Sequence, residues 1–396
     1  MSVWSSLVGQ EAAVAKLSEA AASARAIVAS RGGAHASDDA RSMSHAWLIT
    51  GPPGSGRSVA ARAFAAALQC TGETVGCGHC AGCRTTMGRT NADVVFAATE
   101  TSIINVETAR SLVLQAQSSP SQGLWRVIVV EDADRLGESG ANALLKAIEE
   151  PPEHTVWLLC APSPEDMIAT IRSRCRHLGL RIPTAAAVAD LLVREGVATP
   201  EVALEAARAA QSHIGLARAL ARDPQMRERR RAIITAPASV RSVGEAVMAA
   251  DRLLETAKAQ ADAQVSERNA REKAELMRQL GMDEGESATK ASRTMIRQLE
   301  EDQKRRSKRA LTDAIDRALI DLLAIYRDVL MVQVGGDGEL INTDLADLVG
   351  QIARDSTPRQ TLARVDHIET ARKRLVSNGN PLLVLEDMAI SLRPQA

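Results

Sequence analysis

A glycine-rich segment beginning at residue 51 has the residue types and spacing that can bind phosphate. It lies between the apolar run AWLIT and a stretch with helical spacing, and it consists of Gly51, Pro52, Pro53, Gly54, Ser55, Gly56, Arg57 and Ser58. Glycines let backbone N–H groups point toward phosphate oxygens, and a following helix offers its positive end. Arg57 stands where the phosphate-loop motif has a lysine, and the longer planar guanidinium cannot fill the lysine's position without rearrangement. The segment therefore indicates a nucleotide-binding loop unsuited to hydrolysis, the alternative being a glycine turn without a ligand.

Acidic residues follow the apolar run that starts at Arg126. Glu131, Asp132 and Asp134 come directly after this run. Phosphate-loop ATPases place a magnesium-associated aspartate and a catalytic glutamate at such a strand end. Here the order is inverted, so the shorter Asp132 would have to reach the attacking water. Acidic groups at a strand end are often merely solvated, but beside a phosphate loop they favour a degenerate nucleotide site.

Four of the six cysteines form a C-x6-C-x2-C-x2-C pattern made of Cys70, Cys77, Cys80 and Cys83. Glycines at 76, 78 and 82 permit the tight turns of a metal knuckle, and four thiolates suit a closed, structural, tetrahedral Zn²⁺ site. His79 is an alternative ligand, but the fourth cysteine makes it unnecessary. Because a closed site has no open coordination position, the pattern argues against a catalytic zinc.

A basic run lies at residues 171–176, Ile-Arg-Ser-Arg-Cys-Arg, and contains Arg174. Taken alone, such a run is better explained as a solvated basic face than as a site.

The elements that must position these groups alternate in type along the first half of the chain. Apolar runs at AWLIT, ADVVFA, WRVIVVED and TVWLLCA are separated by segments with helical spacing. Buried strands alternating with helices predict a parallel α/β sheet. From about residue 183 the pattern is helical, and residues 258–309 are dense in both charge signs, which predicts a solvated helical excursion or a partly disordered segment. The fold class is therefore α/β followed by all-α.

The composition restricts the class of partner. The chain has 396 residues, 45% of them hydrophobic, and a formal net charge of -1, so it has no overall field to attract a polyanion. Its one Tyr, two Phe and four Trp offer few platforms for stacking bases. The absence of a long apolar run or of a signal-peptide pattern at the start favours a cytoplasmic location without membrane contact.

Taken in order, several motifs resemble the AAA+ subunits of bacterial DNA polymerase III clamp loaders. They are LVGQE, HAWLITGPPGSGRS, the four-cysteine insert, VIVVEDADRL, ANALLKAIEEPPEHTVWLLCA and TIRSRCRHL. The resemblance implies an AAA+ domain at 1–182 with a zinc module at 70–83, a small helical lid domain at 183–240, and a helical collar domain at 241–396 with a charged insertion at about 258–309. It further implies that Arg174 is an arginine finger acting in trans and that Arg218 is a sensor for nucleotide bound in cis.

Three departures from the hydrolysing tau/gamma pattern resemble the delta-prime group of this family. They are Arg57, the Glu131-Asp132 order, and Cys160-Ala161-Pro162 in place of a threonine-rich sensor. The resemblance implies a non-hydrolysing subunit without independent enzyme activity that binds tau/gamma and delta. It meets the sliding clamp and primer-template DNA through the assembled complex, with ATP and Mg²⁺ bound at most without turnover. Two alternatives stay open: an active tau/gamma-like ATPase, and a zinc-dependent DNA-binding protein that uses the run KRRSKR at 304–309.

Overall fold

The computed structural model describes residues 2–30, 42–97, 104–280 and 290–394. The chain divides into two compact units, Met1–Ala221 and Arg222–Ala396. Each unit has its own hydrophobic core.

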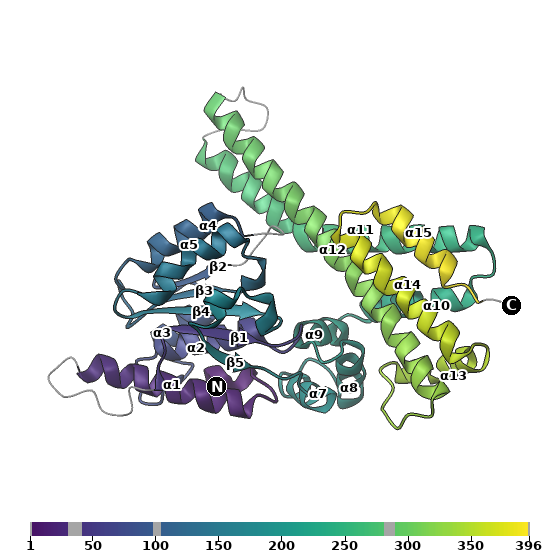
Figure 1. Ribbon diagram of the computed structural model, residues 1–396, viewed down its shortest axis with the longest axis horizontal. Coiled ribbons are helices and arrows are strands. Elements are labelled where there is room, and N and C mark those ends of the chain that lie inside the picture. The colour runs from purple at the N-terminus through teal and green to yellow at the C-terminus, as the bar shows by residue number, and fades with distance from the viewer. Residues whose placement is uncertain (1, 31–41, 98–103, 281–289, 395–396) are drawn as a thin grey trace. The chain divides into compact units, whose positions relative to one another are not determined.

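A five-stranded parallel sheet forms the centre of the first unit (Figure 1). Its strands are β1 Ala46–Thr50, β2 Val94–Ala97, β3 Arg126–Val130, β4 Thr155–Ala161 and β5 Arg176–Gly179. They lie in the order β2-β3-β4-β1-β5, and Thr50 at the end of β1 pairs with Ala161 of β4 and Gly179 of β5. Because parallel strands end at one edge of a sheet, the segments that follow β1, β3 and β4 meet there.

Helices cover both faces of the sheet, which explains why the central strands are apolar on both sides. The helices of this part are α1 Glu11–Ser30, α2 Arg57–Leu68, α3 Ala81–Met87, α4 Val106–Ala116, α5 Glu138–Glu149 and α6 Ala169–Arg172; short 3-10 turns span η1 Val3–Ser6, η3 Ala133–Arg135 and η4 Pro164–Asp166. Trp47 and Ile49 share a core with α1 and α2, whereas Leu48 shares one with α4 and α5. Alternate residues of β1 therefore anchor opposite layers.

Three short helices complete the first unit: α7 Ala185–Arg194, α8 Pro200–Ala209 and α9 Ile214–Arg222. The Thr184 side chain caps the start of α7 by accepting a hydrogen bond from the N–H of Ala187. Val188 and Leu192 of α7 and Ala203 and Ala207 of α8 are fully buried. This part of the first unit is an all-helical region that follows the sheet in the chain.

The second unit is entirely helical within its described residues (Figure 1). Its elements are α10 Pro224–Ser239, α11 Val243–Gln279, α12 Lys290–Gln333, η5 Thr343–Leu345, α13 Ala346–Arg354, α14 Pro358–Val376 and α15 Pro381–Ser391. Ile315, Leu319 and Leu322 of α12 are buried in the centre of its core. Arg230, whose side chain is 10% exposed, adds polar contacts by donating to Asp321 at 3.1 Å and to Asn342 at 2.7 Å.

The described residues of the charged segment 258–309 lie mainly in two long helices that run side by side, α11 and α12 (Figure 1). Small apolar residues such as Ala261 and Val265 face the contact, and Arg306 crosses it to reach Asn269 at 2.7 Å and Glu272 at 2.8 Å. The basic run at 304–309 is thus partly compensated by acidic partners. The middle of the charged segment, residues 281–289, lies outside the described residues.

The predicted fold class is confirmed: a parallel α/β sheet of the AAA+ phosphate-loop type, followed by helical regions. Among the described helices, none combines the length and apolar character needed to cross a bilayer.

Candidate functional site

The glycine loop connects the end of β1 to the start of α2. The N–H of Gly51 donates to the carbonyl of Pro162 at 3.1 Å, which ties the loop to the end of β4. Gly54 and Gly56 have φ angles of 89° and 90°, a region that favours glycine. A Cβ on Gly54 would come within 3.0 Å of the His213 Cα. The positive φ angle and the close approach of His213 therefore both require glycine at position 54.

Backbone donors in this loop are available for a ligand. The N–H groups of Gly54 and Gly56 donate to no described residue, and the buried Ser55 hydroxyl has no hydrogen-bond partner there. Unsatisfied donors at the start of a helix suit a phosphate group. The loop by itself fits a phosphate.

Arg57 folds back on the loop that precedes it. Its Nη1 donates a hydrogen bond to the carbonyl of Gly51. The guanidinium also lies close enough to Asp134 and Cys160 to act on the pKa of each group. A lysine at this position would direct its positive charge at the outer phosphates. The charge of Arg57 is instead directed at a carbonyl of the protein.

Glu131 is paired with Arg89, which could not be predicted as its partner because the two residues lie 42 positions apart. Arg89 follows α3 directly, has a φ of 59°, and places its guanidinium 5.1 Å from the centre of the Phe96 ring. Burial raises the pKa of Glu131, and Arg89 opposes that rise. Because an ion-paired carboxylate is a poor ligand for Mg²⁺, this position does not fit the metal as it stands.

The remaining acidic residues lie at the same edge of the sheet. Burial is the main cause that raises the pKa of Asp134, and the charge of Asp132 adds to it. Burial likewise raises the pKa of the Cys160 thiol to about 12, with a further contribution from Glu131. The thiol is therefore protonated and inert at neutral pH. The structure brings the loop, Glu131, Asp132 and Cys160 together, as the strand order requires.

Arg174 lies apart from this pocket, after the end of α6. Its Nη1 donates to the Thr170 carbonyl at 2.8 Å and to the Ser173 hydroxyl at 3.3 Å, and its Nε pairs with Glu149 at the end of α5. No described residue of the loop or of the acidic group contacts it. The side chain is 39% exposed, so it is accessible to another molecule.

Arg218 does not reach the loop either. It makes two parallel hydrogen bonds to Glu195, at 2.9 and 2.8 Å, which join α9 to the end of α7. The residue of this part that lies against the loop is His213, whose Nδ1 accepts the N–H of Leu216 at 3.2 Å. Sequence reasoning identified Arg218 but missed the histidine that makes the contact.

The four predicted cysteines converge in one group. The Sγ atoms of Cys70, Cys77, Cys80 and Cys83 all lie within 4.8 Å of one another. The N–H of Cys80 donates to Cys77 Sγ and the N–H of Cys83 to Cys80 Sγ, both at 3.4 Å. Burial opposes ionisation of Cys80, but N–H donors from Cys83 and Thr71 lower its pKa to about 5. The donor set fits a metal ion held by four thiolates.

The glycines near these cysteines have different roles. Gly76 and Gly78 have φ angles of 74° and 80° and form the expected turns. Gly82 lies inside α3, where a Cβ would come within 2.0 Å of the Gln69 carbonyl. It serves close packing on the end of α2 and not a turn, so the tight-turn explanation is wrong at this position.

Fold and site together define an AAA+-type phosphate-loop domain with a four-cysteine module. Residues 35–184 match the family described as "DNA polymerase III, delta subunit". The gamma/tau subunit of DNA polymerase III from Mycobacterium tuberculosis is 35% identical over 159 residues, or 39% of this chain and 28% of that protein. The delta' subunit from Escherichia coli is 34% identical over 180 residues, or 44% of this chain and 54% of that protein.

The chain is therefore homologous over part of its length to the gamma/tau and delta' subunits of clamp loaders, and these matches do not separate the two types. The chain spans 28% of the length of the first relative and 54% of the second. Among solved structures, a gamma subunit-related protein from Thermotoga maritima aligns with a TM-score of 0.38 at 16% identity, covering 88% of this chain and 93% of that one.

Proposed function

We propose that this chain is a delta-prime-type subunit of a DNA polymerase III clamp loader, helping to load the sliding clamp onto primed DNA. One observation carries the proposal: the charged groups of its own nucleotide pocket are engaged by the protein, while Arg174 is exposed. In this account the chain contributes to a neighbouring subunit's ATP site and does not turn over ATP itself.

The state of the chain's own pocket supports the absence of turnover. Phosphoryl transfer depends on neutralising charge with a metal and a lysine and on orienting the attacking water. Here Arg57 donates a hydrogen bond to the Gly51 carbonyl, and Arg89 forms an ion pair with the carboxylate of Glu131. The free N–H groups of Gly54 and Gly56 still suit phosphate, so ATP binding without hydrolysis is compatible with this pocket.

The setting of Arg174 supports a role in trans. An arginine supplied by a neighbour stabilises the transferring phosphoryl group and accelerates hydrolysis by about 10³ to 10⁵ in well-studied cases. Arg174 is held at the surface by Thr170 and Glu149, which limits the rotamers available to it before a partner arrives. Reduced freedom lowers the entropy lost when it engages a triphosphate.

The four-cysteine module takes a structural role in this proposal, with Zn²⁺ as its metal. Four thiolates leave no coordination position for substrate. Arg25 of α1 donates to the carbonyls of Cys70 at 2.8 Å and Glu73 at 3.0 Å, so the module is fixed to the sheet domain. The metal would fix the position of α3 and therefore also the position of Arg89, which follows that helix.

Reconstitution tests the proposal. The purified chain should co-elute with gamma/tau and delta from the same organism in size-exclusion chromatography, and clamp loading onto primed DNA should require all of them. A complex of gamma/tau and delta that loads the clamp equally well without this chain would contradict the proposal.

A second candidate is an active gamma/tau-like ATPase, favoured by the 35% identity to a gamma/tau subunit and by the free loop donors. The isolated chain with ATP and Mg²⁺ decides between the two. The proposal expects no turnover above a buffer blank, whereas turnover abolished by Asp132→Ala would establish the second candidate.

A further inference from the structure

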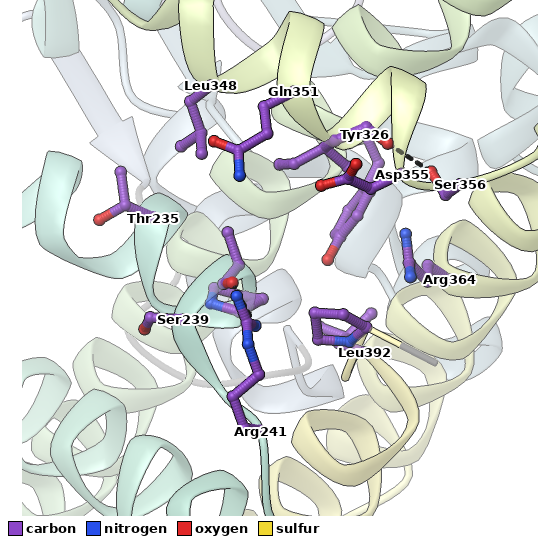
Figure 2. A pocket seen from close by; sticks show the side chains of 14 residues that line it. Thr235, Ser239, Arg241, Tyr326, Leu348, Gln351, Asp355, Ser356, Arg364 and Leu392 are labelled. Carbon is purple, nitrogen blue, oxygen red and sulfur yellow. Dashed lines mark hydrogen bonds between the residues drawn. The ribbon is translucent and has the colours of Figure 1, made fainter. Parts of the chain in front are cut away.

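A cavity of about 290 Å³ lies within the helical second unit, apart from the nucleotide pocket. It is lined by residues from α10 and from α12 to α15, among them Ser239, Tyr326, Gln351, Arg364 and Leu392 (Figure 2). Its volume is near the lower limit of known small-molecule sites.

Arg364 is the feature that distinguishes this cavity. The residue is only 7% exposed, yet its guanidinium donates a hydrogen bond to no described residue. Its protein partner is the ring of Tyr326, whose centre lies 5.8 Å away. In Figure 2 the nitrogen atoms of Arg364 and the Tyr326 hydroxyl lie beside the same open space. A buried guanidinium normally has an acceptor, because burying an unpaired charge is costly.

Arg230 in the same unit is a largely inaccessible arginine whose guanidinium has hydrogen-bond acceptors. Its side chain is 10% exposed and bonds both Asp321 and Asn342. Arg364 has a comparable burial without such acceptors. The difference indicates that the acceptor for Arg364 lies outside the described residues.

The surroundings narrow the chemistry of that acceptor. Tyr326 is a neutral donor, since burial raises the pKa of its hydroxyl to about 12. A second cavity of about 630 Å³ shares Thr235, Ser239 and Leu392 with the first and is bordered by apolar residues such as Ile233, Leu253 and Met388. The lining of the first cavity holds the buried cation of Arg364, the exposed cation of Arg241 and the exposed carboxylate of Asp355. Two cations offset by one carboxylate match a single negative charge on an apolar body better than they match a phosphate dianion.

We propose that Arg364 and Tyr326 bind a carboxylate whose apolar body extends into the neighbouring cavity. The carboxylate belongs either to a free aliphatic acid or to the C-terminus of a peptide with apolar side chains. This site is independent of the clamp-loader assignment, because it uses no residue of the nucleotide pocket.

Titration calorimetry on the full chain tests the ligand class. Octanoate should bind, octanol should bind at least tenfold more weakly, and inorganic phosphate should give no heat at the same concentrations. A peptide ending in Leu-Leu-COO⁻, compared with its C-terminal amide, identifies the source: tighter binding of the acid peptide than of octanoate assigns the site to a peptide terminus, and the reverse to a free acid. No binding by either carboxylate, or equal binding of octanoate and octanol, would overturn the proposal.

Variants test the residues. Arg364→Gln should weaken octanoate binding at least tenfold, whereas Arg359→Gln, an exposed change on the same helix α14, should leave the Kd unchanged. Tyr326→Phe keeps the ring beside Arg364 but removes the hydroxyl, and a loss of several-fold is expected. Circular dichroism establishes that each variant folds. If Arg364→Gln does not fold, an unchanged Kd in Tyr326→Phe together with equal binding of octanoate and octanol refutes the site.

Discussion

At the scale of single residues, the pocket differs from an active ATPase by its internal ion pairs. The inverted Glu131-Asp132 order matters less than the pairing of Glu131 with Arg89, which removes a carboxylate from metal binding. Arg57 is likewise not free to bind a phosphate, because its guanidinium donates a hydrogen bond to the Gly51 carbonyl. The protein itself supplies counter-charges where nucleotide and metal would otherwise supply them.

Replacing Arg89 should therefore expose Glu131 to Mg²⁺. In Arg89→Ala we expect ATP to bind about tenfold more tightly with Mg²⁺ than with EDTA, a gain of ~1.4 kcal/mol, whereas the wild type should show no such difference. A fluorescent ATP analogue titrated in both buffers measures this. Arg84→Ala, on the exposed side of α3, is the matched control. A metal-independent Kd in Arg89→Ala would contradict the role given to the ion pair.

Asp93 is a buried carboxylate that stabilises the sheet domain. It accepts N–H groups from Ser121 at 2.6 Å, Gln122 at 2.8 Å and Gly123 at 2.6 Å. Burial opposes its ionisation, but these donors hold its pKa below the ordinary value. Because the folded pKa is the lower one, the stabilisation is present above the unfolded pKa of about 3.9 and is lost as pH falls through the folded pKa.

Asp93→Asn should lower the free energy of unfolding by about 2 to 3 kcal/mol at pH 7, since one charged acceptor of several N–H groups is lost. Urea unfolding at pH 7 and pH 3 measures the effect, which should shrink at pH 3. Asp190→Asn, an exposed change on α7, should stay within about 0.5 kcal/mol of wild type at both pH values. An Asp93→Asn effect that grows toward pH 3 would show that the carboxylate is not ionised when folded.

At the scale of elements, the sequence predicted those features that depend on local pattern. The apolar runs became β1 to β4, and the cysteine spacing brought four Sγ atoms together, because both follow from residues near each other in the chain. The contacts of Arg89 with Glu131, Arg218 with Glu195 and Arg174 with Glu149 were not predictable. Each joins residues on different elements, so it depends on how helices pack onto the sheet and leaves no periodic signal.

The cysteine module is the element whose role is most directly testable. Cys80→Ser should reduce bound zinc from about one equivalent to near zero and lower the unfolding temperature, because metal binding contributes to the stability of a loop with little core. Metal analysis by mass spectrometry and thermal unfolding measure both effects. Cys175→Ser, outside the four-cysteine group, should keep its zinc. A full equivalent of zinc in Cys80→Ser would assign the fourth ligand elsewhere.

At the scale of the whole molecule, the proposed function assigns Arg174 to a neighbour's triphosphate and treats the chain's own pocket as internally neutralised. A net charge of -1 gives it no general attraction to DNA. The proposed function therefore expects any action on DNA to pass through assembly with other subunits. The family match at residues 35–184 includes the glycine loop, Glu131, Asp132 and Arg174.

The most direct test is the DNA-dependent ATPase rate of a loader reconstituted from gamma/tau, delta and this chain, carrying either wild-type Arg174 or Arg174→Ala. Arg172→Ala, two residues away, controls for the loss of a nearby positive charge. We expect Arg174→Ala to assemble normally and to lose at least tenfold of the ATPase arising at the adjacent site, with Arg172→Ala close to wild type. An assembled Arg174→Ala complex that hydrolyses ATP at the wild-type rate would contradict the account.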